Sequence, residues 1–325
     1  MIRLKFAGGM RMKIAILGAG AMGSPYASYL AAGHDVILVD SYQAQVDWIN
    51  ADGLIKVEKN QSETRFALKA VMSGSDIGVQ DLVIAFVKSI HTYDAVKENQ
   101  ALIGSGTMVM TLQNGAGNNR DIAEFVAKEH IIVGTTSHNS VMMGPGKIYH
   151  SGCGPTNIGP DFPCEQSLQD VKKVADALKE CGLEVNIIEN IQEVLWRKLF
   201  VNCGINALST LMQCKIGEVE ANPHLWELCQ KIVYESVLVA EADGTFFDRR
   251  EAVETVRKVC LSDASGYASM VQDRQNKRRT EIDKINGVVV GLGQKYGIYT
   301  PYNQMLVTEI HAVEAMYPAL TMDKL

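Results

Sequence analysis

The sequence predicts an α/β protein with an N-terminal doubly wound parallel sheet and a C-terminal all-helical domain. Short apolar runs separated by helix-sized connections occupy the first part of the chain, a pattern typical of a mostly parallel sheet covered by helices. From about residue 190 the hydrophobic period becomes helical throughout. We therefore expect one domain at residues 1–189 and a second at residues 190–325.

Strand-like and helix-like segments follow this division. The expected strands cover residues 13–17, 35–40, 82–87, 107–112, 131–134 and 183–188. The expected helices of the second part cover residues 191–212, 223–242, 249–261, 265–275, 280–296 and 301–316. Two of them begin with a capping residue followed by proline, Asn222-Pro223 and Thr300-Pro301, which is a common helix start.

Composition restricts the class of protein. The 325 residues are 47% hydrophobic with a formal charge of −6, which argues against a nucleic-acid partner. No apolar run reaches the roughly 18 residues of a membrane span, and the first residues lack a signal-peptide core. The seven cysteines show no CxxC pair or metal-ligand spacing, so we expect a cytoplasmic protein without a metal. Met12 directly precedes the first strand, and residues 1–11 are expected to be dispensable.

A glycine-rich turn follows the first strand and opens a helix, as Gly18-Ala19-Gly20-Ala21-Met22-Gly23. In this context GxGxxG is the fingerprint of a Rossmann dinucleotide site. One glycine permits the tight turn, the next lets the backbone approach the pyrophosphate, and the third allows close helix–strand packing. We expect cofactor contacts at Gly18, Gly20, Ala21, Met22 and Gly23. The alternative is a glycine turn without a ligand.

Asp40 ends the second strand, about 20 residues after the glycines. A carboxylate there hydrogen-bonds the ribose hydroxyls of NAD and repels the 2′-phosphate of NADP. The segment Asp40-Ser41-Tyr42-Gln43 contains no cation, so NADH is favoured. Alternatively, Asp40 caps an exposed turn and another loop supplies a positive charge.

Two polar residues follow later strands, at the sheet edge where ligands of such folds bind. Lys88 is a candidate for cofactor or substrate contact, and Asn114 follows the strand at residues 107–112. The alternatives are a solvated lysine and an ordinary Asn-Gly turn.

The most specific pattern is a polar ladder in a nearly apolar segment: Lys198, Asn202 and Asn206 recur every four residues. On a helix this spacing puts them on one face. Buried amides beside a lysine favour an anionic, oxygen-rich ligand, whereas a lysine at the wet start of a core helix is the alternative. Ser269 and Glu281 are further candidates. Glu281 is expected in the first turn of a helix, where the helix dipole alone would explain a carboxylate.

These residues resemble the ketopantoate reductase (2-dehydropantoate 2-reductase) family over nearly the whole chain from Met12. The resemblance rests on the GxGxxG turn, Lys88, Gln113-Asn114-Gly115, the block from Trp196 to Asn206, and the block from Ser269 through Glu281 to Gly287. It implies a Rossmann domain joined to a helical substrate and dimerisation domain. The implied reaction reduces 2-dehydropantoate to pantoate, towards pantothenate and coenzyme A.

The resemblance also assigns roles. Lys198 is the general acid, Glu281 a catalytic carboxylate, and Asn202, Asn206 and Ser269 hold substrate. Lys88 and Asn114 face the nicotinamide and the substrate. NADPH, with a basic residue after the second strand, is the family default, whereas this chain has Asp40-Ser41 at that place, which favours NADH.

Two other functions compete with this interpretation. A related NAD(P)H-dependent reductase would share the lysine and carboxylate and act on another branched or hydroxylated 2-oxo acid. A non-catalytic dinucleotide sensor would not need Lys198 and Glu281. A homodimer is compatible with the sequence, and His138 and His150 are expected to be structural or solvated.

Overall fold

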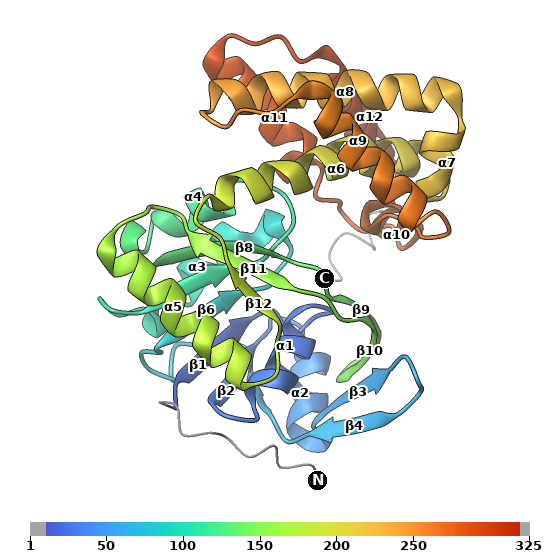
Figure 1. The fold of residues 1–325 in the computed structure, drawn as a ribbon. Helices are drawn as coiled ribbons and strands as arrows, with labels where there is room; N and C mark the ends of the chain where they lie inside the picture. Colours follow the sequence, from blue (N-terminus) through green and yellow to red (C-terminus); the bar gives the residue numbers. More distant parts are fainter. Residues whose placement is uncertain (1–10, 319–325) are drawn as a thin grey trace. The chain divides into compact units, whose positions relative to one another are not determined.

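The computed structural model describes residues 11–318, which form two compact units (Figure 1). Unit 1 contains the described residues up to Gln113 together with Asn118–Ile191. Unit 2 contains Asn114–Gly117 and the described residues from Gln192 onward. The expectation for residues 1–11 falls almost entirely outside the described part of the chain. No helix between residues 11 and 318 is both long and apolar enough to span a membrane.

Unit 1 is built on an eight-stranded sheet. In spatial order its strands are β12 (Val185–Ile187), β11 (Thr156–Pro160), β8 (Ile131–Thr136), β7 (Met108–Thr111), β6 (Leu82–Ala85), β1 (Lys13–Leu17), β2 (Asp35–Val39) and β5 (Lys69–Val71). Every neighbouring pair is parallel except β11 and β8. Strands β6 and β7 are buried along their whole length, as expected for a parallel sheet covered on both faces. The predicted α/β class is confirmed.

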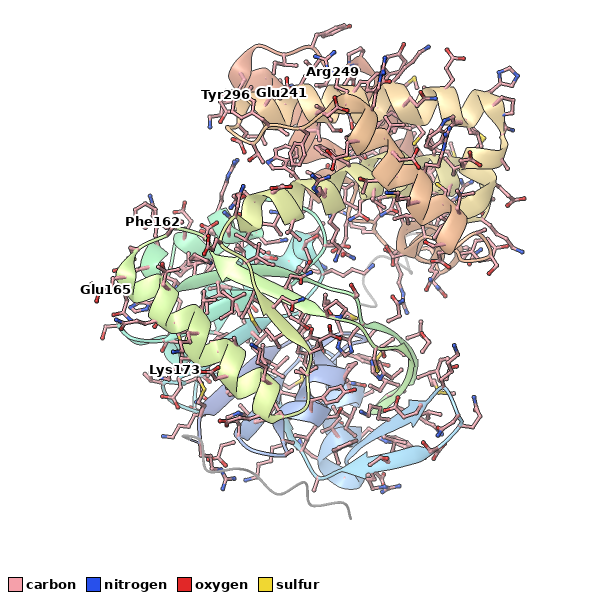
Figure 2. The ribbon with its side chains drawn as sticks, in the orientation of Figure 1. Phe162, Glu165, Lys173, Glu241, Arg249 and Tyr296 are labelled. Atoms are coloured by element: carbon pink, nitrogen blue, oxygen red, sulfur yellow. The ribbon has the colours of Figure 1, made fainter. Side chains whose placement is uncertain are left out.

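The helices of unit 1 are α1 (Gly23–Leu30), α2 (Gln43–Asp52), α3 (Thr92–Glu98), α4 (Asn118–Ala123) and α5 (Glu165–Glu180), with short 3₁₀ turns η1 (Ser89–His91), η2 (Gln100–Leu102) and η3 (Lys128–His130). Helix α5 packs on β11 and β12 (Figure 1). Its outer face carries exposed charged side chains, among them Glu165 and Lys173 (Figure 2). The buried side chains of α1, α5 and the central strands form one continuous apolar core.

A second, four-stranded sheet was not expected from the sequence. Its order is β4 (Glu63–Phe66), β3 (Leu54–Glu58), β10 (Lys147–Gly152) and β9 (Asn139–Gly144). The β9–β10 hairpin takes the chain out of the main sheet after β8 and returns it as β11. Because no helical crossover intervenes, β11 lies antiparallel to β8.

Unit 2 is helical: α6 (Ile191–Met212), α7 (Ile216–Ala221), α8 (Pro223–Ala242), α9 (Arg249–Ser262), α10 (Ser269–Gln275), η4 (Ile282–Lys284), α11 (Asn286–Tyr296) and α12 (Pro301–Ala315). Asn222 caps α8 through its side chain, as predicted, whereas Thr300 makes no side-chain cap bond. The helix expected at residues 280–296 is wrong at its start. The 3₁₀ turn η4 covers only Ile282–Lys284, and the α-helix begins at Asn286.

A buried carboxylate on α8 holds the start of α12. Both oxygens of Glu235 accept hydrogen bonds, from the backbone N–H groups of Tyr302 and Asn303 at 3.0 Å and from Asn303 Nδ2 at 2.8 Å. The Asn303 amide also receives a bond from Asn286 Nδ2 at 2.9 Å. These bonds satisfy helix N-terminal donors that would otherwise be buried without partners.

Replacing this carboxylate should therefore destabilise unit 2. Glu235→Ala leaves buried N–H groups without acceptors, and we expect a loss of roughly 1–3 kcal/mol or more in the free energy of unfolding. Urea denaturation measures it. The matched control is Glu227→Ala on the same helix, whose exposed ion pair with Lys231 should change stability by less than about 1 kcal/mol. Equal effects of the two substitutions would contradict the anchoring role of Glu235.

Candidate functional site

The glycine turn after β1 is shaped by close packing. Gly18 has φ +100°, and a Cβ there would lie 2.8 Å from the backbone nitrogen of Val87. A Cβ at Gly23 would collide with the carbonyl oxygen of Gly18 and lie 3.1 Å from Ile16 Cγ2. The fold itself therefore requires both glycines. Gly20 differs, because a Cβ there would meet nothing within 4 Å. This open space beside the turn fits the close approach of a phosphate group.

Asp40 braces the same turn. Its Oδ2 accepts the N–H of Ala19 at 2.7 Å, and its Oδ1 accepts the N–H of Tyr42 at 2.8 Å. The Ala19 carbonyl in turn accepts bonds from Gln45 Nε2 at 2.6 Å and Ser24 Oγ at 2.7 Å. A carboxylate has about four acceptor sites, so ribose hydroxyls could still be accommodated. The half-buried Ala21 and Met22 lie between this turn and α1.

Lys88 lies at the carboxyl-end edge of the main sheet. It is half-buried and directly precedes η1. The strand before it, β6, ends beside β1, since the N–H of Phe86 donates to the Leu17 carbonyl at 2.8 Å. Gln113 stiffens this edge by donating from Nε2 to the Val87 carbonyl and, at 2.9 Å, to Thr92 Oγ1. The next residue, Asn114, belongs to unit 2, whereas Gln113 belongs to unit 1.

In unit 2, helix α6 carries the polar ladder. Lys198 and Asn202 are half-buried, and Asn206 is buried among apolar neighbours of the core. The Nδ2 atom of Asn202 is buried and has no hydrogen-bond partner. Native structures rarely leave such a donor unsatisfied, so Asn202 Nδ2 is a candidate contact for a ligand oxygen. Ladder spacing and an orphan donor together favour a polar ligand against this face.

The electrostatic surroundings of Lys198 also favour proton transfer from its ammonium group. Burial lowers the pKa of its ammonium to about 8, although the negative charge of Glu281 acts in the opposite direction. A lysine with this pKa is protonated at neutral pH and can still release its proton. Efficient general acids have a pKa near the working pH. The Lys198 ammonium can therefore act as a proton donor, and the charge of Glu281 favours its protonated form.

The segment that carries Glu281 is fixed by contacts that the sequence does not signal. The N–H of Thr280 donates to the buried Glu314 Oε1 at 2.7 Å, and Asp283 bonds His311 Nε2 at 2.8 Å. On the other side, the N–H of Ala116 donates to the Lys284 carbonyl at 2.8 Å. Glu281 thus precedes a 3₁₀ turn and does not lie in the first turn of an α-helix, which corrects our expectation.

Ser269 begins α10 and is exposed. This short helix is tied to the end of α6 by Arg274, whose Nη1 donates to the carbonyls of Thr210 and, at 3.2 Å, Leu211. The guanidinium satisfies carbonyls that a helix C-terminus leaves open. Arg274 and Glu314 therefore position site segments, although no spacing in the sequence distinguishes them from surface charges.

The glycine turn with Asp40 in unit 1, and the polar face of α6 in the helical unit 2, are features of an oxidoreductase that binds a nicotinamide dinucleotide. The profile described as ketopantoate reductase PanE/ApbA matches residues 14–161, and its C-terminal counterpart matches residues 190–314. The chain belongs to the ketopantoate reductase family.

Individual proteins agree with this assignment. A 2-dehydropantoate 2-reductase of Streptococcus pyogenes is 32% identical over 307 residues, covering 94% of this chain and 99% of the relative. One of Halobacterium salinarum is 33% identical over 294 residues, covering 89% and 95%. Among solved structures, a D-mandelate dehydrogenase with NADH and anilino(oxo)acetate has 33% identity and a TM-score of 0.87, covering 94% and 98%. A PanE/ApbA family ketopantoate reductase from Ralstonia eutropha has 29% identity and a TM-score of 0.85, covering 94% and 99%.

The glycine turn yields a paired prediction. Gly20→Ala should fold normally, since its Cβ meets nothing, but should weaken dinucleotide binding by about tenfold or more if a phosphate occupies that space. Gly23→Ala should lower stability by roughly 1–3 kcal/mol, because the new Cβ overpacks the turn. Thermal melts and fluorescence titration with NADH measure both. Unchanged NADH affinity in Gly20→Ala would argue against a phosphate at this glycine.

Proposed function

We propose that the chain reduces 2-dehydropantoate to pantoate with a nicotinamide dinucleotide, a step towards pantothenate and coenzyme A. The observation that carries this proposal is Lys198, with a pKa of about 8, next to the unpartnered amide of Asn202 on α6. The names of the curated relatives support the substrate. A homodimer and a cytoplasmic location remain predictions from the sequence.

The glycine turn and Asp40 suit the cofactor. Open space at Gly20 would receive the pyrophosphate, and Asp40 would bind ribose hydroxyls through its remaining acceptor sites. Lys88 and Asn114 are proposed for the nicotinamide and substrate side. When bound, reduced nicotinamide supplies the hydride for the carbonyl carbon.

The chain's own part in the reaction is proton delivery and positioning. The Nζ of Lys198 gives a proton to the ketone oxygen as negative charge develops there, and solvent later returns a proton to the neutral amine. Glu281 holds the ammonium in its charged form before transfer. Asn202, Asn206 and Ser269 are proposed to hold the substrate's hydroxyl and carboxylate oxygens.

A second candidate is reduction of a different 2-oxo acid. The D-mandelate dehydrogenase neighbour, solved with NADH and anilino(oxo)acetate, supports this alternative because its fold and identity match as well as those of the reductases. A panel of initial rates separates the two. The proposal expects kcat/KM for 2-dehydropantoate to exceed that for phenylglyoxylate and for 2-oxoisovalerate by at least about tenfold, which is 1.4 kcal/mol of preference. A reversed order would favour the second candidate.

The cofactor preference follows from Asp40. A 2′-phosphate near this carboxylate costs about 1–3 kcal/mol at an effective dielectric constant near 20, so NADH should have the higher kcat/KM. Asp40→Asn should narrow the difference while retaining an oxygen that can accept the Ala19 N–H. Parallel NADH and NADPH kinetics on both proteins provide the measurement. A tenfold preference for NADPH in the unsubstituted chain would refute the proposal and require a cation from another loop.

Lys198 is the residue that the mechanism depends on most. Lys198→Ala should keep the fold and NADH affinity and lose about 10²–10⁴-fold in kcat, the usual range for general acid catalysis. Lys198→Arg should not recover this loss, because a guanidinium scarcely releases its proton. A matched control is Lys295→Ala, an exposed lysine of α11. Steady-state kinetics in which Lys198→Ala retains a third of the original kcat would exclude the assigned role.

The lowered pKa of Lys198 sets the pH dependence. Reduction needs the protonated lysine, so kcat/KM should be level below pH about 8 and fall about tenfold per unit above it. The residual activity of Lys198→Arg should lack this fall. A profile that stays level up to pH 10 would show that another group supplies the proton.

A further inference from the structure

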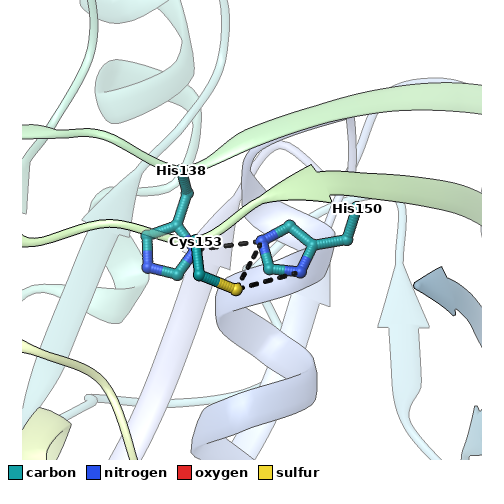
Figure 3. Close-up of side chains that lie close together, drawn as sticks. All are labelled: His138, His150 and Cys153. Carbon is teal, nitrogen blue, oxygen red and sulfur yellow. Dashed lines mark hydrogen bonds between the residues drawn. The ribbon is translucent and has the colours of Figure 1, made fainter. Parts of the chain in front are cut away.

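Three potential metal ligands meet at the base of the β9–β10 hairpin in unit 1. The chain leaves the main sheet at Thr136 and returns at Thr156, and the N–H of Ser137 bonds the Pro155 carbonyl at 3.1 Å between the two crossing segments. His138 precedes β9, His150 lies in β10 and Cys153 follows it (Figure 3). Their linear spacing resembles no familiar metal motif, so only the hairpin brings them together.

The ligand atoms converge closely. Nδ1 of His138 lies 3.0 Å from Nε2 of His150, and Cys153 Sγ lies 4.0 Å from the same Nε2 and 3.9 Å from Nδ1 of that ring (Figure 3). One donor atom from each residue lies within 4.8 Å of the others. Zinc bonds of about 2.0–2.1 Å to nitrogen and 2.3 Å to sulfur, at tetrahedral angles, give separations of about 3.3 Å and 3.6 Å. The two imidazole nitrogens are therefore within a few tenths of an ångström of this geometry, and a movement of the exposed Cys153 side chain would complete the site.

A carboxylate fixes the orientation of one imidazole. Glu58 Oε2 lies 3.1 Å from His150 Nδ1, and because a carboxylate only accepts, that nitrogen carries the proton. The lone pair of Nε2 then points towards His138, as in the carboxylate–histidine–zinc arrangement of many metal sites. Lys56 neutralises Glu58 across 2.9 Å, so this pair adds no net charge.

Burial and access are also suitable. Both histidine side chains are buried, whereas Cys153 is exposed and leaves a path for an ion. The hydrogen bond between the imidazoles requires one shared proton. If His138 shifts its proton to Nε2, a cation can take the place of that shared proton without net proton release from the imidazoles. The thiol loses its proton on binding.

We propose that His138, His150 and Cys153 form a zinc site that fastens the base of the β9–β10 hairpin, with water as the fourth ligand. The site lies outside the proposed catalytic residues. Its role is to stabilise unit 1, because an ion that binds only the folded chain raises stability by mass action.

Cobalt provides the test, since Co²⁺ occupies zinc sites and its thiolate complexes absorb light. Full-length protein treated with chelator should bind one Co²⁺ per chain with a thiolate-to-cobalt charge-transfer band, and Zn²⁺ should displace it. Cys153→Ser should abolish the band. Glu58→Gln should weaken Co²⁺ binding by roughly 10–100-fold, the usual cost of losing such a carboxylate partner.

Cys164→Ser is the matched control, because this thiol lies elsewhere, at the start of α5, and serine can keep its capping bond. It should retain the band. Zn²⁺ should also raise the melting temperature of the original chain and of Cys164→Ser. It should not raise the melting temperature of Cys153→Ser, which lacks one of the proposed ligands. Failure to bind stoichiometric Co²⁺, or a band that survives Cys153→Ser, would overturn the proposal.

Discussion

A lysine ammonium held on the nearly apolar helix α6 is the constraint on which the candidate site depends. Removing the charge from water is costly, and burial lowers the pKa of Lys198 even though Glu281 partly compensates. The same desolvation makes the proton easier to release and strengthens electrostatic interactions with a developing alkoxide. Desolvation of the Lys198 ammonium thus accounts both for its lowered pKa and for its ability to stabilise a developing alkoxide.

Buried polar contacts keep this arrangement in place. Glu314 holds the segment before Glu281, Arg274 closes the end of α6, and Glu235 fixes the start of α12. These contacts are satisfied within unit 2. The buried Nδ2 of Asn202 and Oδ1 of Asn286 lack such partners. Leaving the Asn202 donor unsatisfied costs roughly 1–3 kcal/mol, which a ligand oxygen could return.

Local patterns determine how much could be predicted. Helices 191–212 and 223–242 were predictable to the residue, because long apolar stretches and the Asn222-Pro223 start are strong local signals. The polar ladder of Lys198, Asn202 and Asn206 could be predicted because it interrupts one of these apolar stretches at helical spacing. The second sheet was missed, since β4 and β9 are largely exposed and lack the buried apolar run of a central strand. Glu281 was misplaced because its segment follows a distant acceptor, Glu314, in preference to local helix propensity.

Contacts between residues far apart in the chain are harder to predict from local sequence patterns. The electrostatic coupling of Lys198 to Glu281 joins residues 83 positions apart (281 − 198), and the hairpin unites His138 with Cys153 by a turn that no spacing rule predicts. The folded chain brings Glu281 close enough to Lys198 to affect its pKa, and it brings Cys153 close to His138 and His150. The family resemblance already paired Lys198 with Glu281, whereas the grouping of His138, His150 and Cys153 had no signal in the sequence.

The pKa of Lys198 is the most direct measure of the account. The protein can be labelled with ¹³C and ¹⁵N lysine and titrated by NMR, the Lys198 resonance being assigned by its absence from Lys198→Arg. If Lys198 is the general acid, its titration midpoint should lie at about 8. A midpoint near the ordinary lysine value of about 10.4 would contradict it, since Lys198 would then be a solvated ammonium with no special acidity.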